Sequence, residues 1–208
     1  NLKQSKPATL GEQMKVLVQP RLVLVYLMTI LGYGGTFTAF TYLAPILQEE
    51  AGFAPSAISL IMLVYGASVA VGNIYGGKLA DKKGPIRALT IIFSALAVIL
   101  FALTFTMGSK LAAVITVLVW GAFAFGNVPG LQVYVVQLAE KFTPNAVDVA
   151  SGLNIAAFNI GIALGSIIGG AIVDGMQLSD TAWVGALISV AALVVTRFSG
   201  HLDKRALA

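Results

Sequence analysis

Residues able to do covalent chemistry are scarce in this sequence. It has no Cys, and its one His, His201, lies close to the C-terminal end. A thiol nucleophile, a disulfide and a Cys- or His-based metal site are therefore excluded, as is a Ser–His hydrolytic pair inside an apolar segment. No metal, cofactor or enzymatic activity is expected, so the function must rest on non-covalent binding.

Aromatic and neutral polar side chains recur at helical spacing within three apolar stretches. Such faces suit a sugar or a lipophilic drug, through ring stacking and hydrogen bonds. Helix packing, with Asn as an interhelical hydrogen-bonding residue, and an interfacial aromatic belt remain alternatives for each of them. In the fourth span, Gln132 lies to one side of the face that carries Trp120, Phe123 and Asn127. The candidate cavity residues are Tyr26, Thr29, Tyr33, Phe37, Trp120, Phe123, Asn127, Asn154, Phe158 and Asn159.

The composition places these residues in a membrane protein. The chain is 58% apolar and 11% charged, against about 25% charged in soluble domains, so it cannot build the surface of a soluble globule. Its charged residues leave six uncharged stretches of 16 to 29 residues, and about 20 apolar residues cross a bilayer as a helix. The stretches are too long for the strands of a membrane barrel. The expected spans are 20–48, 56–80, 86–107, 111–139, 147–173 and 180–198.

These spans define a six-helix transmembrane bundle over residues 20–198. Residues 1–19 form a polar stretch that resembles a linker between domains, and residues 199–208 form a tail. Two prolines, Pro45 and Pro129, lie inside apolar spans and are expected to kink their helices.

The positive charges predict the orientation of the bundle. Six spans place both ends and the second and fourth loops on one side, and that side holds twelve of the 13 Lys and Arg residues. Lys110 stands alone on the other side. Positive residues favour the cytoplasmic side, so both ends and the predicted linker and tail are expected to be cytoplasmic. The same distribution accounts for the net charge of +4 without nucleic-acid binding.

The second and fifth spans carry the same pattern, G-x-I-x-G-G-x-x-x-D. It runs from Gly72 to Asp81 and from Gly165 to Asp174, 93 residues later. Three spans per copy is an odd number, so the two copies must cross the membrane in opposite directions. Inverted three-helix repeats are typical of secondary transporters. The sequence therefore predicts an all-α membrane protein of two inverted three-helix repeats.

Glycines in these two spans recur every four residues, at Gly72 and Gly76 and at Gly161, Gly165 and Gly169. Small residues at this spacing let helix backbones approach each other closely. The second and fifth helices are thus expected to face another helix rather than lipid, and the five glycines form a predicted helix seam.

The loop after the second span, GGKLADKKGPIRA, resembles the cytoplasmic loop motif of the major facilitator superfamily. The matching residues are Gly77, Asp81, Lys82, Gly84 and Arg87. The fourth and fifth spans are similar to those of its bacterial sugar-efflux and drug:proton antiporter branch. The resemblance covers nearly the whole chain, but only the C-terminal six helices of a twelve-helix transporter.

This resemblance implies a set of partners and roles. The partners are the lipid bilayer of the bacterial inner membrane, a small-molecule substrate, and an N-terminal six-helix half or a second copy as a homodimer. The proton gradient is the implied source of energy. The loop motif acts as a gate in which Asp81 meets helix ends and a basic residue. The first and fourth helices line the central cavity, and the second and fifth form the seam between halves.

The function predicted is the C-terminal half of a secondary transporter that exports a sugar or drug-like molecule by alternating access. A membrane scaffold that binds a partner without transport is the alternative. A small oligomeric channel is less favoured, because the sequence shows no pore-lining ring of one residue type.

Overall fold

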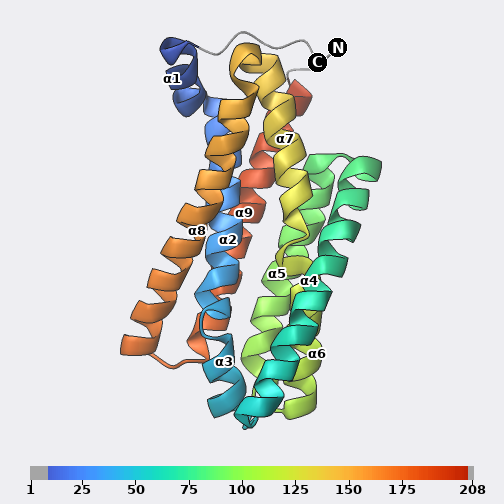
Figure 1. Ribbon diagram of the computed structural model, residues 1–208, viewed down its shortest axis with the longest axis vertical. Helices are drawn as coiled ribbons and strands as arrows, with labels where there is room; N and C mark the ends of the chain where they lie inside the picture. The colour runs from blue at the N-terminus through green and yellow to red at the C-terminus, as the bar shows by residue number, and fades with distance from the viewer. Residues whose placement is uncertain (1–8, 206–208) are drawn as a thin grey trace.

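The computed structural model describes residues 9–205, and these contain helices and no strands (Figure 1). Six segments are long and apolar enough to cross a membrane, which confirms the predicted fold class. They alternate in direction, so α1 and the end of α9 lie at the same end of the bundle. The elements are α1 (Leu10–Val18), α2 (Pro20–Phe40), α3 (Leu43–Pro45), η1 (Ile46–Glu50), α4 (Pro55–Lys83), α5 (Pro85–Thr106), α6 (Lys110–Ala124), α7 (Asn127–Phe142), η2 (Pro144–Ala146), α8 (Val147–Gly175) and α9 (Asp180–Arg205).

Proline begins four of these segments. Pro20, Pro55 and Pro85 are the first residues of α2, α4 and α5, and Pro144 begins η2. The fixed φ of proline suits the first helical turn, and its missing N–H is not needed there because that group has no partner within the helix. Between α4 and α5, Gly84 adopts a φ of 78°, a left-handed conformation that glycine reaches without a steric penalty.

Two spans are interrupted four residues before an internal proline. The fourth span breaks at Phe125, and the proline four residues later is Pro129. Since proline has no N–H, it cannot bond to the carbonyl four residues earlier. The Val128 N–H donates to the Phe125 carbonyl at 3.2 Å instead. In the first span, α2 ends at a turn that begins at Thr41, and Pro45 follows four residues later. Both spans are thus interrupted close to the prolines that were expected to kink them.

Glycines bring two pairs of helices into backbone contact. A Cβ atom added at Gly72 of α4 would lie 1.9 Å from the Ala122 carbonyl oxygen of α6. One added at Gly165 of α8 would lie 2.5 Å from the Gly34 carbonyl oxygen of α2. Such close approach leaves no room for a side chain. The other three seam glycines make similar contacts: Gly76 with Gly126, Gly161 with Ile30, and Gly169 with Thr38.

The assignment of these glycines to a seam between two bundles is therefore wrong. All five are buried and face helices of their own bundle. Periodic small residues indicate that a backbone approaches, but the pattern carries no information on which helix approaches. The expectation that α4 and α8 each pack against another helix is correct.

The two glycine contacts also reveal the internal symmetry. α4 runs toward the end of the bundle that carries α1, and α8 runs away from it (Figure 1). Gly72 and Gly165 differ by 93 in residue number, and their partners, Ala122 and Gly34, differ by 88. The same contact thus occurs twice in helix pairs of opposite direction, which confirms the inverted repeats.

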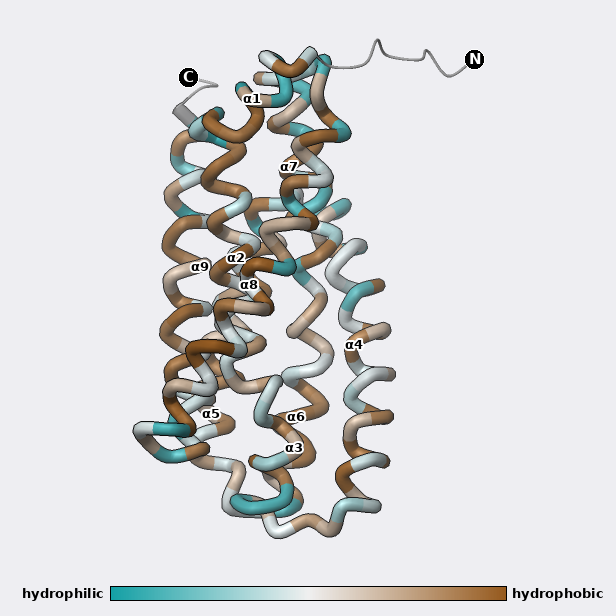
Figure 2. The backbone as a smooth tube through the Cα atoms, turned by 60° about the vertical axis from the view of Figure 1, so that its left-hand side comes forward, coloured by the Kyte–Doolittle hydropathy of each residue, from teal (hydrophilic) through white to brown (hydrophobic). Residues whose placement is uncertain are grey.

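The exterior of the bundle is apolar over most of its length. α2 is central and packs against α7, α8 and α9. Figure 2 shows hydrophilic residues mostly near the two ends, as expected for a protein embedded in lipid. α4 and α8 are the least buried spans, and their exposed apolar residues include Leu60, Leu63, Val71, Ile74, Ile155, Ile160, Leu164 and Ile167.

The described residues near both ends of the chain are more helical than the sequence predicted. Within the predicted linker, α1 begins with a capping box between Thr9 and Glu12, and its Val16 is fully buried. Within the predicted tail, α9 continues to Arg205, and Ser199 is fully buried. The rest of that linker and tail, 1–8 and 206–208, lies outside the described residues.

Candidate functional site

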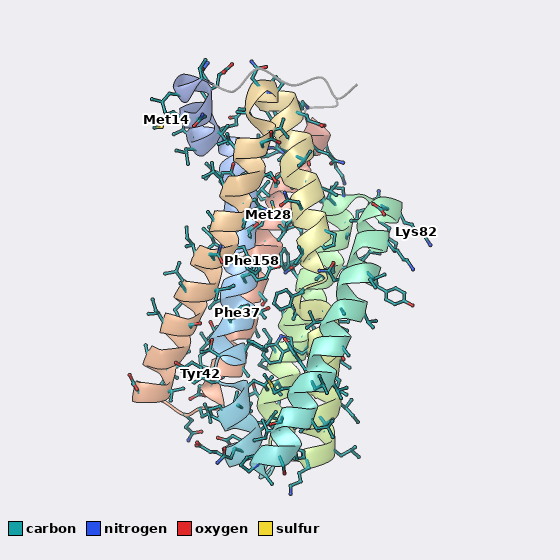
Figure 3. All side chains as sticks on the ribbon, in the orientation of Figure 1. Met14, Met28, Phe37, Tyr42, Lys82 and Phe158 are labelled. Carbon is teal, nitrogen blue, oxygen red and sulfur yellow. The ribbon has the colours of Figure 1, made fainter. Side chains whose placement is uncertain are left out.

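A hollow of about 200 Å³ lies between α2, α7 and α8, and we call it the candidate pocket. It lies near the middle of the bundle, where Figure 3 labels Phe158. Four residues that the sequence proposed for a cavity line it together. The lining residues are Thr29, Tyr33, Val128, Leu131, Gln132, Asn154, Ile155 and Phe158.

A chain of hydrogen bonds orients the polar side chains of this pocket. The Thr29 hydroxyl lies 2.6 Å from Asn154 Oδ1, and Asn154 Nδ2 donates to Gln132 Oε1 at 3.3 Å. Gln132 Nε2 in turn donates to the Ser151 hydroxyl. Thr29 and Asn154 are buried, so these bonds offset the cost of placing amides in an apolar bundle. The amides are held in place before any ligand arrives.

Aromatic rings form the other wall. The Tyr33 and Phe158 rings meet edge to face with centroids 4.0 Å apart, and Phe125 lies 5.7 Å from Tyr33. Phe37 extends this cluster, 6.5 Å from Tyr33. The Tyr33 hydroxyl is buried and has no hydrogen-bond partner among the described residues. It is therefore an unsatisfied polar group within one of the residues that line the pocket.

The remaining predicted cavity residues lie elsewhere. Trp120 is fully buried and packs against Tyr65, with ring centroids 5.8 Å apart. Asn127 is also fully buried, and its amide lies beside Gly32 of α2. Asn159 is exposed and donates to the Ile155 carbonyl of its own helix. Tyr26 and Phe123 are half-buried and do not line the pocket.

The break at Phe125 explains why the candidate residues of the fourth span do not gather at this pocket. Helical spacing places residues on one face only while the helix is continuous. The break separates α6 from α7, so Trp120 and Phe123 do not share a face with the pocket residues of α7. Gln132, which the sequence placed to one side, lines the pocket instead. Its position as a rare amide within an apolar span was the signal that could have identified it.

A second polar cluster, which the sequence did not predict, ties together α2, α7 and α9. Arg21 forms an ion pair with Asp203, and the Tyr134 hydroxyl donates to Asp203 Oδ2 at 2.8 Å. The Tyr134 and Ser199 hydroxyls are also 2.8 Å apart. Tyr134 and Ser199 are buried. This cluster fastens three helices at the end of the bundle that carries α1.

The loop motif lies between α4 and α5. Asp81, Lys82 and Arg87 are all exposed, and Gly84 forms the turn described above. The ion pair found among the described residues is Arg21–Asp203, so Asp81 has no basic partner within this part of the chain. Gly77 faces Pro129: a Cβ atom added at Gly77 would lie 3.7 Å from the Pro129 side chain. Any basic partner of Asp81 would come from outside the described residues.

Six helices long and apolar enough to cross a membrane, in two inverted triplets with a pocket midway along them, define a multi-pass membrane protein with the repeat architecture typical of secondary transporters. Comparison with known proteins then gives the family. The sequence profile of the Major Facilitator Superfamily matches residues 2–142, and the chain belongs to this family.

Two curated relatives cover nearly all of the chain. The first is the Bacillus subtilis "Uncharacterized MFS-type transporter YtbD", 51% identical over 98% of this chain and 51% of the relative. The second is the Escherichia coli "Inner membrane transport protein YdhP", 34% identical over 91% of this chain and 48% of the relative. The chain thus spans about half the length of these relatives.

A solved structure shares the fold. FucP, an Escherichia coli fucose:proton symporter solved in an outward conformation, superposes with a TM-score of 0.76 and 13% sequence identity. The match covers 92% of this chain and 45% of FucP. At this identity the likeness concerns the fold alone.

Proposed function

We propose that this chain forms one half of a secondary transporter that exports a neutral small molecule, sugar-like or drug-like, by alternating access. A proton gradient drives the exchange. The transporter lies in a bacterial cytoplasmic membrane with both ends of this chain on the cytoplasmic side, as the distribution of Lys and Arg favours. The inner-membrane relative from Escherichia coli supports this location.

One observation carries the proposal: a pocket at mid-length that combines oriented amides with aromatic rings. Substrate sites of secondary transporters lie near the bilayer midplane, between repeats. Here α2 belongs to the first repeat, and α7 and α8 belong to the second. A scaffold would have no need for a polar-lined hollow at this position, so the pocket favours transport over the scaffold alternative.

The lining residues favour a neutral substrate. None of them carries a charge, and a charged solute entering an apolar bundle without a counter-ion would pay a large desolvation cost. Amides and hydroxyls can bond to the hydroxyls of a sugar or the polar groups of a drug, while Tyr33 and Phe158 stack on apolar surfaces. The volume of about 200 Å³ is small for a binding site, so the other half of the transporter supplies the opposite wall.

Energy coupling and gating both require that other half. No carboxylate or His lines the pocket, so the coupling proton binds outside it, on the N-terminal bundle. Asp81 is exposed and unpaired among the described residues, and it is available to a helix end of the opposite bundle when the cytoplasmic side closes. A second copy of this chain is the alternative to an N-terminal bundle as the opposite half of the transporter.

The test is export by the chain co-expressed with the N-terminal half of the Bacillus subtilis relative. Inside-out vesicles would be given a proton gradient and a panel of neutral aryl glycosides and neutral aromatic drugs. We expect gradient-driven uptake of at least one compound. The variant Asn154→Leu should lower that uptake roughly tenfold, because a hydrogen bond to the substrate or to Gln132 is lost.

Asn159→Leu is the matched control, since it removes an exposed amide from the same helix. Its uptake should equal that of the unchanged chain. Absence of gradient-driven uptake for the whole panel, in cells where both bundles are present in the membrane, would favour the scaffold. An equal effect of the two substitutions would reject the pocket as the substrate site.

A further inference from the structure

We propose that the outer surface of α5 binds an anionic phospholipid. The headgroup phosphate is held by cations at the turn between α4 and α5, and one acyl chain runs along α5 and α9. This surface is distinct from the candidate pocket, which lies between α2, α7 and α8.

The headgroup site is a hollow of about 410 Å³ lined by Lys82, Lys83, Arg87, Thr90 and Ile91. All three cations are exposed and form no ion pair with the described residues. The neighbouring Asp81 is also exposed and supplies one negative charge against three positive ones, while Asp203, which lines an adjoining hollow with Lys83 and Arg87, is neutralised by its ion pair with Arg21. The site therefore has a surplus of hydrogen-bond donors and positive charge, which suits a phosphate group.

The turn between α4 and α5 lies away from the tip of the bundle. In Figure 1 it ends well short of the tips of α7 and α8, and Lys82 points outward from the bundle in Figure 3. The cations thus stand beside the apolar exterior rather than at the tip of the molecule. Basic residues at this level attract anionic lipids.

An apolar stripe leads away from the cations along α5. Ile91, Val98 and Phe105 are spaced seven residues apart, so they share one face of the helix, and they are 39%, 68% and 74% exposed. Beside Val98 a second hollow, of about 260 Å³, lies between α5 and α9, where Phe101, Leu187 and Val190 are among its walls.

The spacing of the two hollows matches a lipid. Seven residues of helix separate Ile91 from Val98 by about 10 Å, within the hydrocarbon depth of one leaflet, which is about 15 Å. An acyl chain attached to a phosphate at the cations would therefore reach the second hollow. A free phosphate shares the headgroup chemistry but makes no use of the stripe, and a zwitterionic lipid brings an ammonium group that the cations repel.

The test is native mass spectrometry of the delipidated chain in detergent. It would be titrated with dioleoyl phosphatidylglycerol, dioleoyl phosphatidylcholine, short-chain dihexanoyl phosphatidylglycerol and inorganic phosphate. We expect the long-chain anionic lipid to bind more tightly than each of the others, by about tenfold or more. The comparison of lipids needs no variant, so it does not depend on the folding of a mutant.

A charge-neutralising variant locates the site. Lys82→Gln/Lys83→Gln/Arg87→Gln should weaken phosphatidylglycerol binding about tenfold or more. Lys15→Gln/Lys141→Gln/Arg197→Gln removes the same charge from exposed positions elsewhere and should change it less than about twofold. Equal losses in the two variants, equal affinity for the two long-chain lipids, or equally tight binding of phosphate or of the short-chain lipid would each overturn the proposal.

Discussion

Gly165 of α8 lies against Gly34 of α2 so closely that a Cβ atom at position 165 would be 2.5 Å from the Gly34 carbonyl oxygen. The contact recurs in inverted form between Gly72 and Ala122. α2 contributes Thr29 and Tyr33 to the candidate pocket, and α8 contributes Asn154 and Phe158. The glycine contact therefore sets the distance between two walls of the pocket.

We expect Gly165→Ala to lower stability by about 1–3 kcal/mol, because the added methyl group overpacks a backbone contact that cannot relax. Gly152→Ala is the matched control on the same helix, since nothing lies within 4 Å of an added Cβ there. The control should be neutral, or stabilising by up to about 1 kcal/mol, because alanine favours helix. Thermal unfolding in detergent measures both, and equal effects would contradict the close contact.

Tyr33 and Tyr134, two of the buried tyrosines, should respond differently to loss of the hydroxyl. Tyr134→Phe should cost about 1–2 kcal/mol, because it leaves the Ser199 hydroxyl without its partner and removes one hydrogen bond to Asp203, which keeps its ion pair with Arg21. Tyr33→Phe should not lower stability, since its hydroxyl has no partner among the described residues. It should instead lower transport of substrates that carry a hydrogen-bonding group. Thermal unfolding of each variant, with vesicle uptake for Tyr33→Phe, separates the two roles.

The Arg21–Asp203 ion pair should contribute modestly to stability. The two side chains are 14% and 34% exposed, so solvent screens part of the attraction, and Asp203→Asn should cost about 1 kcal/mol. Asp174→Asn, at an exposed position that forms no ion pair with the described residues, should have no effect. If the pair acts as a unit, adding Arg21→Gln to Asp203→Asn should cost less than the sum of the two single changes.

The attachment of α1 should weaken in acid. A hydrogen bond from Asn145, followed by bonds from Thr9, lowers the pKa of the Glu12 carboxyl below its usual value. Because the pKa is lower in the folded state, the stabilisation is present above the unfolded pKa and is lost as the pH falls through the folded pKa. The substitution Met14→Cys introduces the one thiol of the chain. A fluorophore attached to that thiol should show decreasing anisotropy below about pH 4. Glu12→Gln should remove this pH dependence; an unchanged acid response in that variant would place its cause elsewhere.

Much of the architecture could be predicted because it depends on local properties of the chain. The gaps between charges predicted six spans, and the repeated glycine pattern with an odd number of spans predicted inverted triplets. Prolines predicted both helix breaks. Each of these inferences uses hydropathy, length or backbone chemistry, which a segment carries wherever its neighbours lie.

The arrangement of the site depended on contacts between distant segments. Hydropathy and helical spacing determined that the chain is a six-helix membrane bundle with aromatic and amide faces. Only the tertiary structure decided that Gln132 lines the pocket while Trp120 does not, because the break at Phe125 changes which residues of the span share a face. It also decided which helices the glycines meet, and it joined Arg21 to Asp203. The physical reason is that small or polar residues indicate a contact without identifying the partner, and the partner is fixed only when the helices pack.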